Sequence, residues 1–128
     1  MKTVLTVAGS DPSGGAGIQA DIKTITAHGL YATSAITALT VQNTLGVSRV
    51  EPVPVDLVAQ QIDCVVGDIR PDAVKIGMLC NAEIVQAVAQ ALAHGQAECI
   101  VIDPVMISTS GHRLLDQEAV QWMKRKLF

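Results

Sequence analysis

The sequence predicts an α/β fold with three layers, in which helices cover both faces of a mostly parallel sheet. Two observations support this prediction. Short apolar runs typical of strands alternate with segments whose apolar residues recur at helical spacing. The composition is 49% hydrophobic but only 2% aromatic and 16% charged. A parallel sheet buried on both faces needs aliphatic runs of this kind.

Four apolar runs predict buried strands, at residues 4–8, 35–41, 73–78 and 99–103. A helix is expected after each of them, since apolar residues recur with helical spacing in residues 18–25, 58–69, 84–92 and 120–127. The predicted order is therefore β-α-β-α-β-α-β-α, about four β-α units in one domain. Residues 44–54 and 107–115 are expected to be irregular connections.

Residues at the predicted helix ends are typical caps. Asp56, Asn81 and Asp116 precede helical segments and can accept hydrogen bonds from free backbone N–H groups. Two helices end in Ala-His-Gly, where Gly29 and Gly95 are expected to adopt the left-handed conformation. The neighbouring histidines, His28 and His94, are therefore interpreted as structural residues that interact with the last carbonyls of each helix.

Charge and hydropathy exclude several classes of protein. A net charge of −3 without a basic cluster argues against nucleic-acid binding. The basic run at residues 124–126 is expected to complement a helix C-terminus. Mean hydropathy is +0.38, yet no run approaches the roughly 20 apolar residues that span a bilayer. No signal peptide is apparent. Three cysteines without metal-ligand spacing, Cys64, Cys80 and Cys99, predict a reduced, cytoplasmic protein.

The predicted strands end in residues suited to ligand binding. The residues at these ends are Gly9-Ser10-Asp11, Gln42-Asn43, Gly77-Met78 and Asp103-Pro104-Val105. In open α/β sheets, ligands bind outside the carboxyl ends of the strands. We therefore expect all four strand ends to lie along one edge and to form a small-molecule site.

The glycine-rich segment 9–17 is the strongest local signal. Its glycines permit close backbone approach to a ligand, and a helix N-terminus follows. It is not a Walker A loop, because Gly15 stands where that motif needs lysine. Residues 15–20 fit the dinucleotide pattern G-x-G-x-x-A, but Gln42 replaces the acid that would hold a ribose. A turn that only packs helix against strand would not need the flanking Asp11 and Asp21.

Several polar residues at strand ends have alternative interpretations. The amide of Gln42 suits the adjacent donor and acceptor of a pyrimidine, although such amides also satisfy loop backbone. Lys75, inside a predicted strand, is interpreted as a snorkelling or hydrogen-bonded lysine. Asp103 is expected either to hold a Mg²⁺–phosphate group or to cap the next loop. The loop at residues 108–112 could close over a ligand, and His112 within it could be functional or merely exposed.

Four segments together resemble the hydroxymethylpyrimidine/phosphomethylpyrimidine kinases of thiamine biosynthesis, which have the ribokinase-like fold. They are AGSDPSGGAGIQAD (8–21), TALTVQN (37–43), KIGML (75–79) and DPVM (103–106). The resemblance implies ATP-dependent phosphorylation of a hydroxymethylpyrimidine and then of its monophosphate. It also implies Mg²⁺ near Asp103, and a possible homodimer in the full-length enzyme. The implied pyrimidine-binding residues are Gly9, Ala16, Asp21, Thr40, Gln42, Met78 and Val105.

Two departures from the family pattern affect the expected activity. Thr109 stands where many members have a loop lysine. The Gly-Thr-Gly-x segment, which in the family supplies the anion hole and the catalytic residue, is absent from the sequence. We therefore expect residues 1–128 to be the substrate-binding, N-terminal half of a ribokinase-like domain. Its catalytic residues are expected beyond Phe128, and the chain is expected to be inactive alone.

Three alternatives stay open at this point. A pyridoxal kinase of the same fold would bind a similar flat ring with a hydroxymethyl group. A non-catalytic module could keep only the pyrimidine pocket. A nicotinamide-dependent oxidoreductase would rest on the G-x-G-x-x-A match alone.

Overall fold

Four parallel strands form the centre of the fold in residues 1–103, the part of the chain that the computed structural model describes. They lie in the order β2-β1-β5-β6, so that the first strand of the chain is internal. Their bounds are Thr3–Ala8 (β1), Tyr31–Ile36 (β2), Ala73–Ile76 (β5) and Ile100–Ile102 (β6). The predicted parallel sheet is confirmed.

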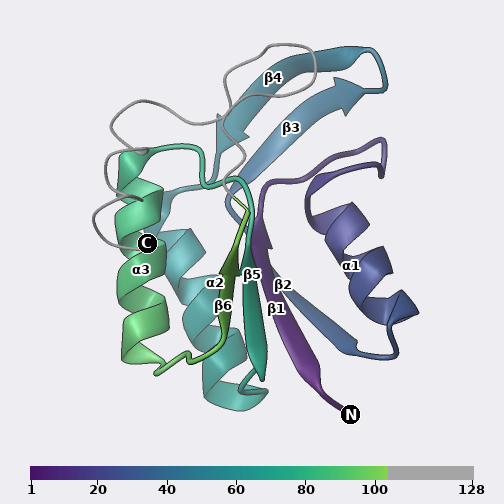
Figure 1. The fold of residues 1–128 in the computed structure, drawn as a ribbon. Helices are drawn as coiled ribbons and strands as arrows, with labels where there is room; N and C mark the ends of the chain where they lie inside the picture. Colours follow the sequence, from purple (N-terminus) through teal and green to yellow (C-terminus); the bar gives the residue numbers. More distant parts are fainter. Residues whose placement is uncertain (104–128) are drawn as a thin grey trace.

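Helices cover both faces of this sheet. Helix α1 (Gly17–Ala27) lies against one face, and α2 (Val55–Asp68) and α3 (Ala82–His94) pack together on the other (Figure 1). The three-layer prediction therefore holds. Among residues 1–103, no helix has the length and apolar character needed to cross a lipid bilayer.

The main core fills the space between the sheet and the α2–α3 layer. Its largest fully buried side chains are Leu5, Val7, Val58, Ile62, Ile76, Leu79, Ile84, Val85, Val88 and Leu92. Each such side chain contributes about 1.5–3 kcal/mol relative to an exposed position. The helical spacing of the apolar residues in α2 and α3 is what brings them to this one face.

The N-termini of α2 and α3 differ in how they are capped. The Asn81 side chain accepts a hydrogen bond from the Ile84 N–H at 2.9 Å, as predicted. The predicted Asp56 cap is wrong, because α2 begins at Val55, two residues earlier than a cap at Asp56 implies. Pro54 holds the cap position there without a side-chain bond, and Asp56 lies in the first turn. Proline suits this place because its missing N–H would have no helical partner.

The C-termini of α1 and α3 also differ. Gly29 has the predicted left-handed conformation, with φ +75°. The prediction for Gly95 is wrong, since its φ is −77° and the next residue, Gln96, has φ +58°. Gly95 is needed for packing instead. A Cβ on Gly95 would come within 2.7 Å of the Val66 side chain on α2.

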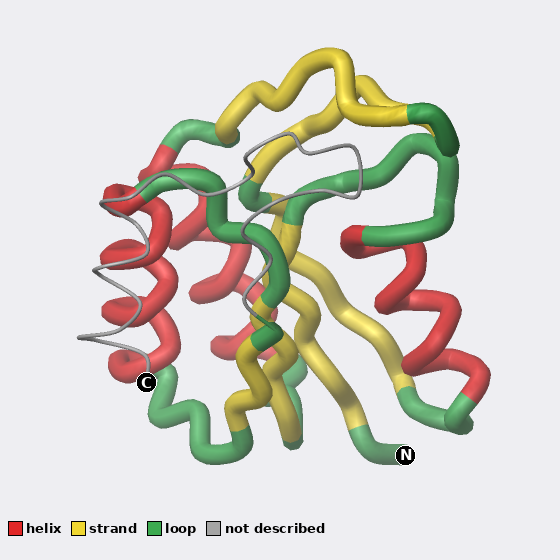
Figure 2. The backbone as a smooth tube through the Cα atoms, turned by 45° about the horizontal axis from the view of Figure 1, so that its top comes forward, coloured by secondary structure: helices red, strands yellow, loops and turns green. Residues whose placement is uncertain are grey.

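The run at residues 35–41, predicted as a single strand, is divided at Thr37. Strand β2 ends at Ile36, and β3 (Ala38–Asn43) leaves the sheet to pair antiparallel with β4 (Gly46–Pro52). The segment 44–54, predicted to be irregular, thus contains the whole of β4. In Figure 2 this hairpin projects past the carboxyl end of the parallel strands. The apolar run continues through Thr37, so periodicity could not reveal the break.

Candidate functional site

Three of the four predicted strand ends meet at the carboxyl edge of the sheet. The Gly77 N–H donates to the Val7 carbonyl at 2.8 Å, and the Asp103 N–H donates to the Ile76 carbonyl at 2.8 Å. The ends of β1, β5 and β6 are therefore neighbours. The prediction that Gln42 ends a fourth strand of this sheet is wrong. Gln42 lies in the hairpin that rises from the same edge.

Gly9 and Met78 form a tight contact at this edge. A Cβ on Gly9 would collide with the Met78 methyl group. Gly17 is equally crowded, because a Cβ there would collide with the Gly9 carbonyl oxygen, and its φ is +58°. The Ile18 N–H also donates to that carbonyl at 2.9 Å. The first turn of α1 is thus packed directly onto the end of β1, and only glycine fits at both positions.

Ser10 joins the glycine-rich loop to the hairpin. Its N–H donates to the Ala38 carbonyl at 2.9 Å, and its hydroxyl accepts from the Thr40 N–H at 3.0 Å. Its carbonyl accepts from the Thr40 hydroxyl at 2.7 Å and from the Gln42 amide at 3.4 Å. The sequence placed Ser10 at a strand end of the expected site but did not indicate these contacts with the hairpin. Two predicted site residues, Thr40 and Gln42, are brought together by it.

The Gln42 side chain has a defined orientation. Its amide nitrogen donates to the Thr40 hydroxyl at 2.9 Å and to the Ser10 carbonyl at 3.4 Å. A carbonyl can only accept, so the nitrogen of the amide must face Ser10. Both N–H groups are used in these bonds. The amide oxygen, Oε1, is therefore the group that Gln42 can offer to a ligand, as an acceptor.

Asp11 holds the glycine-rich loop in shape. Its buried carboxylate accepts hydrogen bonds from the Ser13 N–H at 2.9 Å, the Ser13 hydroxyl at 2.6 Å and the Gly15 N–H at 3.1 Å. Burial by itself would raise the pKa of Asp11, but these bonds and one from the Ala16 backbone outweigh it and lower the pKa below its ordinary value. The role of Asp11 in these contacts is to order the loop.

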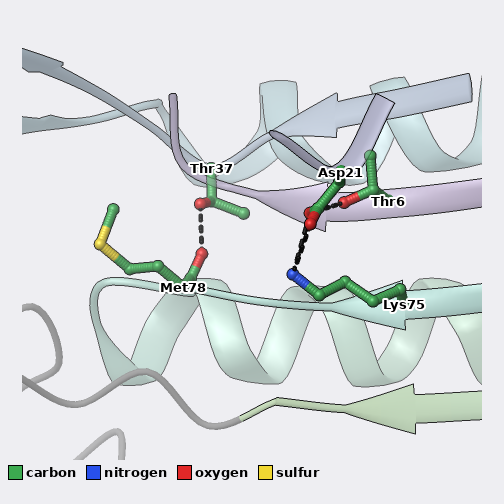
Figure 3. A network of polar contacts seen from close by, with 5 residues as sticks. All are labelled: Thr6, Asp21, Thr37, Lys75 and Met78. Carbon is green, nitrogen blue, oxygen red and sulfur yellow. Dashed lines mark hydrogen bonds and ion pairs between the residues drawn. The ribbon is translucent and has the colours of Figure 1, made fainter. Parts of the chain in front are cut away.

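Asp21 lies against the face of the sheet below this loop. Its carboxylate receives the Lys75 ammonium at 2.9 and 3.0 Å and the Thr6 hydroxyl at 2.6 Å (Figure 3). The interpretation of Lys75 as a hydrogen-bonded lysine is confirmed, but its partner was not foreseen. The only sign of this ion pair in the sequence was a charged residue, Lys75, in an otherwise apolar strand.

The other predicted site residues have less defined surroundings. Ala16 is the exposed N-cap residue of α1. Asp103 follows β6 and is exposed at the carboxyl edge. Val105 lies outside the described residues, as do Thr109, His112 and the predicted Asp116 cap.

An open groove of about 730 Å³ lies at the opposite edge of the sheet. It is lined by residues at the C-terminal ends of α2 and α3 and by the segments that lead into β5 and β6, among them Arg70, His94 and Gln96. Ligands of open α/β sheets bind at the carboxyl ends of the strands. We therefore place the candidate site at the Gly9–Met78 edge and not in this groove.

A family model matches most of the chain. Residues 11–128 match the model described as phosphomethylpyrimidine kinase. The chain belongs to the phosphomethylpyrimidine kinase family. The match covers the glycine-rich segment from Asp11 onward and all the later strand ends, so a dinucleotide-binding oxidoreductase is no longer needed to explain the G-x-G-x-x-A pattern.

Known proteins of this family and of a related one share the fold. A hydroxymethylpyrimidine/phosphomethylpyrimidine kinase from Haemophilus influenzae is 50% identical over 99% of this chain and 47% of its own. A crystal structure of phosphomethylpyrimidine kinase from Clostridium difficile superimposes with a TM-score of 0.92 at 48% identity, over 99% of this chain and 55% of that one. Pyridoxal kinase from Staphylococcus aureus, in complex with AMP-PCP and pyridoxal, gives 0.83 at 35% identity, over 99% and 44%.

The lengths of these proteins limit the comparison. The chain spans about half the length of the phosphomethylpyrimidine kinases that it matches. What is shared is the parallel sheet, its helices and the carboxyl edge described above.

Proposed function

We propose that this chain forms the pyrimidine-binding half of an ATP-dependent kinase of thiamine biosynthesis. Its substrates would be 4-amino-5-hydroxymethyl-2-methylpyrimidine and then the monophosphate of this compound. The family of the chain supports the proposal. The observation that carries it is the orientation of Gln42, whose amide oxygen is left as an acceptor at the carboxyl edge of the sheet.

An aminopyrimidine matches this arrangement chemically. Its exocyclic amino group is a fixed donor in the plane of the ring, and an amide oxygen accepts from such a group. Binding sites built to pair a polar group reject analogues that lack it, because the protein group is then left unpaired. We propose that Gly9, Ala16, Thr40, Met78 and Val105 line the rest of the pocket, and that Gln42 and Asp21 read the polar groups of the ring.

ATP and Mg²⁺ are the cofactors that this proposal needs. In phosphoryl transfer the protein supplies mainly positioning and charge stabilisation. Mg²⁺ is commonly held by one or two carboxylates together with substrate phosphates. Asp103 fits such a role, since its exposed carboxyl group follows the end of β6. No group of three or more potential metal ligands occurs among residues 1–103, so the nucleotide phosphates would have to complete the coordination.

We further propose that the 128 residues bind the pyrimidine without transferring a phosphoryl group. The Gly-Thr-Gly-x segment that the family resemblance implies for catalysis is absent from the sequence. A cytoplasmic location and a homodimer of the full-length enzyme belong to the same proposal. The exposed Leu39 and Val41, on the face of the hairpin turned away from Ser10, offer an apolar surface that a second copy could cover.

A pyridoxal kinase is the second candidate. The Staphylococcus aureus pyridoxal kinase has a similar fold at lower identity. The ring of pyridoxal also carries a hydroxymethyl group. Pyridoxal has a ring hydroxyl in place of an amino group. This hydroxyl also accepts and can ionise, whereas the amino group must donate to Gln42.

Isothermal titration of the purified chain with each ring compound tests the proposal. We expect the aminopyrimidine to bind more tightly than pyridoxal, and ATP with Mg²⁺ to give no phosphorylated product. Tighter binding of pyridoxal would favour the second candidate. No binding of either compound would contradict the assignment of the site, and turnover by these 128 residues would contradict their proposed inactivity.

A further inference from the structure

The carboxylate of Asp21 is held by two donors from two different strands. Lys75 on β5 contacts both of its oxygens, at 3.0 Å to Oδ1 and 2.9 Å to Oδ2, and Thr6 on β1 donates to Oδ2 at 2.6 Å. Thr6 and Lys75 are directly paired in the parallel ladder. Figure 3 shows the Asp21 side chain reaching from α1 to these two neighbours.

This ion pair is largely removed from solvent. The side chains of Lys75 and Asp21 are 27% and 18% exposed, and Thr6 is fully buried. Buried ion pairs add little net stability, because desolvation of both charges offsets their attraction. Apolar residues of similar size would pack α1 on the sheet at least as well. The presence of two charges here therefore suggests a role beyond folding.

The position of the pair connects it to the candidate site. A Cβ added to Gly77 would lie 3.1 Å from the Lys75 ammonium nitrogen and 3.0 Å from the Ala8 Cβ. The ammonium group thus lies beside Gly77, at the end of β5. Gly77 precedes Met78, whose methyl group contacts Gly9. The ion pair therefore lies beside Gly77, one residue along the chain from the contact between Met78 and Gly9.

The hydrogen bonds of Asp21 leave it little freedom. A carboxylate has about four acceptor positions, two on each oxygen. Lys75 uses one on each oxygen and Thr6 uses a second on Oδ2. One position on Oδ1 is left for a ligand. A ligand group at that position must be an N–H or O–H donor, since a phosphate or carboxylate would be repelled.

We propose that Lys75 is a positioning residue for substrate recognition. By fixing both oxygens of Asp21, it presents a single charged acceptor, Oδ1, in one orientation to a donor group of the ring compound. Lys75 itself does not touch the ligand. This inference rests on the proposed function, in which Asp21 belongs to the pyrimidine pocket.

The test measures ring binding by variants of the protein. The first probe is 4-amino-5-hydroxymethyl-2-methylpyrimidine. The second is 5-ethyl-2,4-dimethylpyrimidine, which has nearly the same shape but no N–H or O–H donor. Lys75→Met is expected to weaken binding of the first probe about tenfold, as loss of one oriented hydrogen bond would, and to leave the second unchanged. A purely structural role would weaken both alike.

Two further variants complete the design. Asp21→Asn should weaken binding of the first probe at least as much as Lys75→Met does. The double variant should bind this probe no more weakly than Asp21→Asn alone. Asp72→Asn is the matched control. Asp72 also joins a lysine, Lys2, and a threonine, Thr3, but it precedes β5 and lies at the opposite edge of the sheet. This control should bind both probes like the wild type.

The outcomes separate the inference from the proposed function. If the wild type binds neither probe, both fail. If the wild type binds the first probe and Lys75→Met binds it equally well, the inference fails and the proposed function stands. If Asp21→Asn binds it equally well, the inference fails together with the proposed contact between Asp21 and the ring, and the rest of the proposed function stands. Lys75→Leu replaces Lys75→Met if the methionine variant does not fold. It also removes the donor and the charge, and unchanged affinity in this variant also overturns the inference.

Discussion

The Thr37 hydroxyl donates to the Met78 carbonyl at 2.6 Å, and this bond joins the break between β2 and β3 to the segment after β5 (Figure 3). Thr37 is fully buried, and its N–H donates to the Ala8 carbonyl at 3.0 Å. The hairpin is thereby held at a fixed place above the carboxyl edge of the sheet. Met78 in turn contacts Gly9, so Thr37 supports the floor of the candidate site.

Thr37→Val should therefore destabilise the protein. The substitution keeps the shape of the side chain but leaves the buried Met78 carbonyl without this donor, at a cost of about 1–3 kcal/mol. Urea denaturation measures the loss. Thr33→Val is the control, because Thr33 also donates to a carbonyl, that of Val4, but is only partly buried. Equal losses in the two variants would show that the Thr37 bond has no special role.

Two Gly→Ala substitutions should have opposite effects. Gly9→Ala places a methyl group against Met78 and should lower both stability and pyrimidine affinity. Gly67 lies inside α2, and a Cβ there would meet no atom within 4 Å. Gly67→Ala should raise the free energy of unfolding by about 0.5–1 kcal/mol, since alanine favours helix. Thermal denaturation and titration of both variants check these signs. A stable Gly9→Ala protein with normal affinity would contradict the packing described for the site.

Gln42→Glu should impair pyrimidine binding more than a change of size can explain. The glutamate would turn an oxygen toward the Ser10 carbonyl, where the amide nitrogen now donates, and the two oxygens would repel. We expect affinity to fall at least about tenfold. Gln42→Ala should also weaken binding, and His94→Ala, in the groove at the far edge, should not. A similar loss in Gln42→Ala and His94→Ala would contradict the placement of the site.

The contribution of Asp11 should depend on pH in a defined direction. Its pKa is lower in the folded protein than the ordinary value of 3.8, because the bonds from Ser13, Ala16 and Gly15 outweigh its burial. Its charged form therefore stabilises the fold above that value, and this stability is lost as the pH falls through the lower, folded pKa. Asp11→Asn should cost stability at pH 7. The difference from wild type should shrink as the pH falls below 3.8, as urea denaturation across this range would show. A difference that does not change with pH would argue against the charged role.

Local patterns predicted much of the fold. The Asn81 cap and the apolar face of α3 depend on residues within one or two helical turns of one another, so the sequence shows both directly. The break at Thr37 has no such local mark. It results from contacts with Ala8, Val53 and Met78, which are distant in the sequence. Asn43 and Gly46 pair across a two-residue turn whose central residues, Thr44 and Leu45, are not the Asn-Gly or Asp-Gly that marks a hairpin in the sequence.

The candidate site was predicted only in part, because some of its features depend on local sequence and others on contacts between distant residues. Residues that follow strands, such as Gly9 and Met78, are placed by the general rule for parallel sheets. That rule does not show which groups a polar side chain will contact. Asp21 and Lys75 are 54 positions apart, and Ser10 and Gln42 are 32 apart. No spacing rule links such pairs, so only the folded structure shows which groups are used internally and which are offered to a ligand.

The internal position of β1 has a consequence for synthesis of the protein on the ribosome. Its two neighbours are β2, which ends at Ile36, and β5, which ends at Ile76. One side of the first strand thus stays unpaired until residue 76 has left the exit tunnel. Long-range parallel pairing of this kind is slow and exposes strand edges to aggregation. The nascent chain therefore passes through a stage in which β1 and β2 are complete and the edge of β1 that later pairs with β5 is still unpaired.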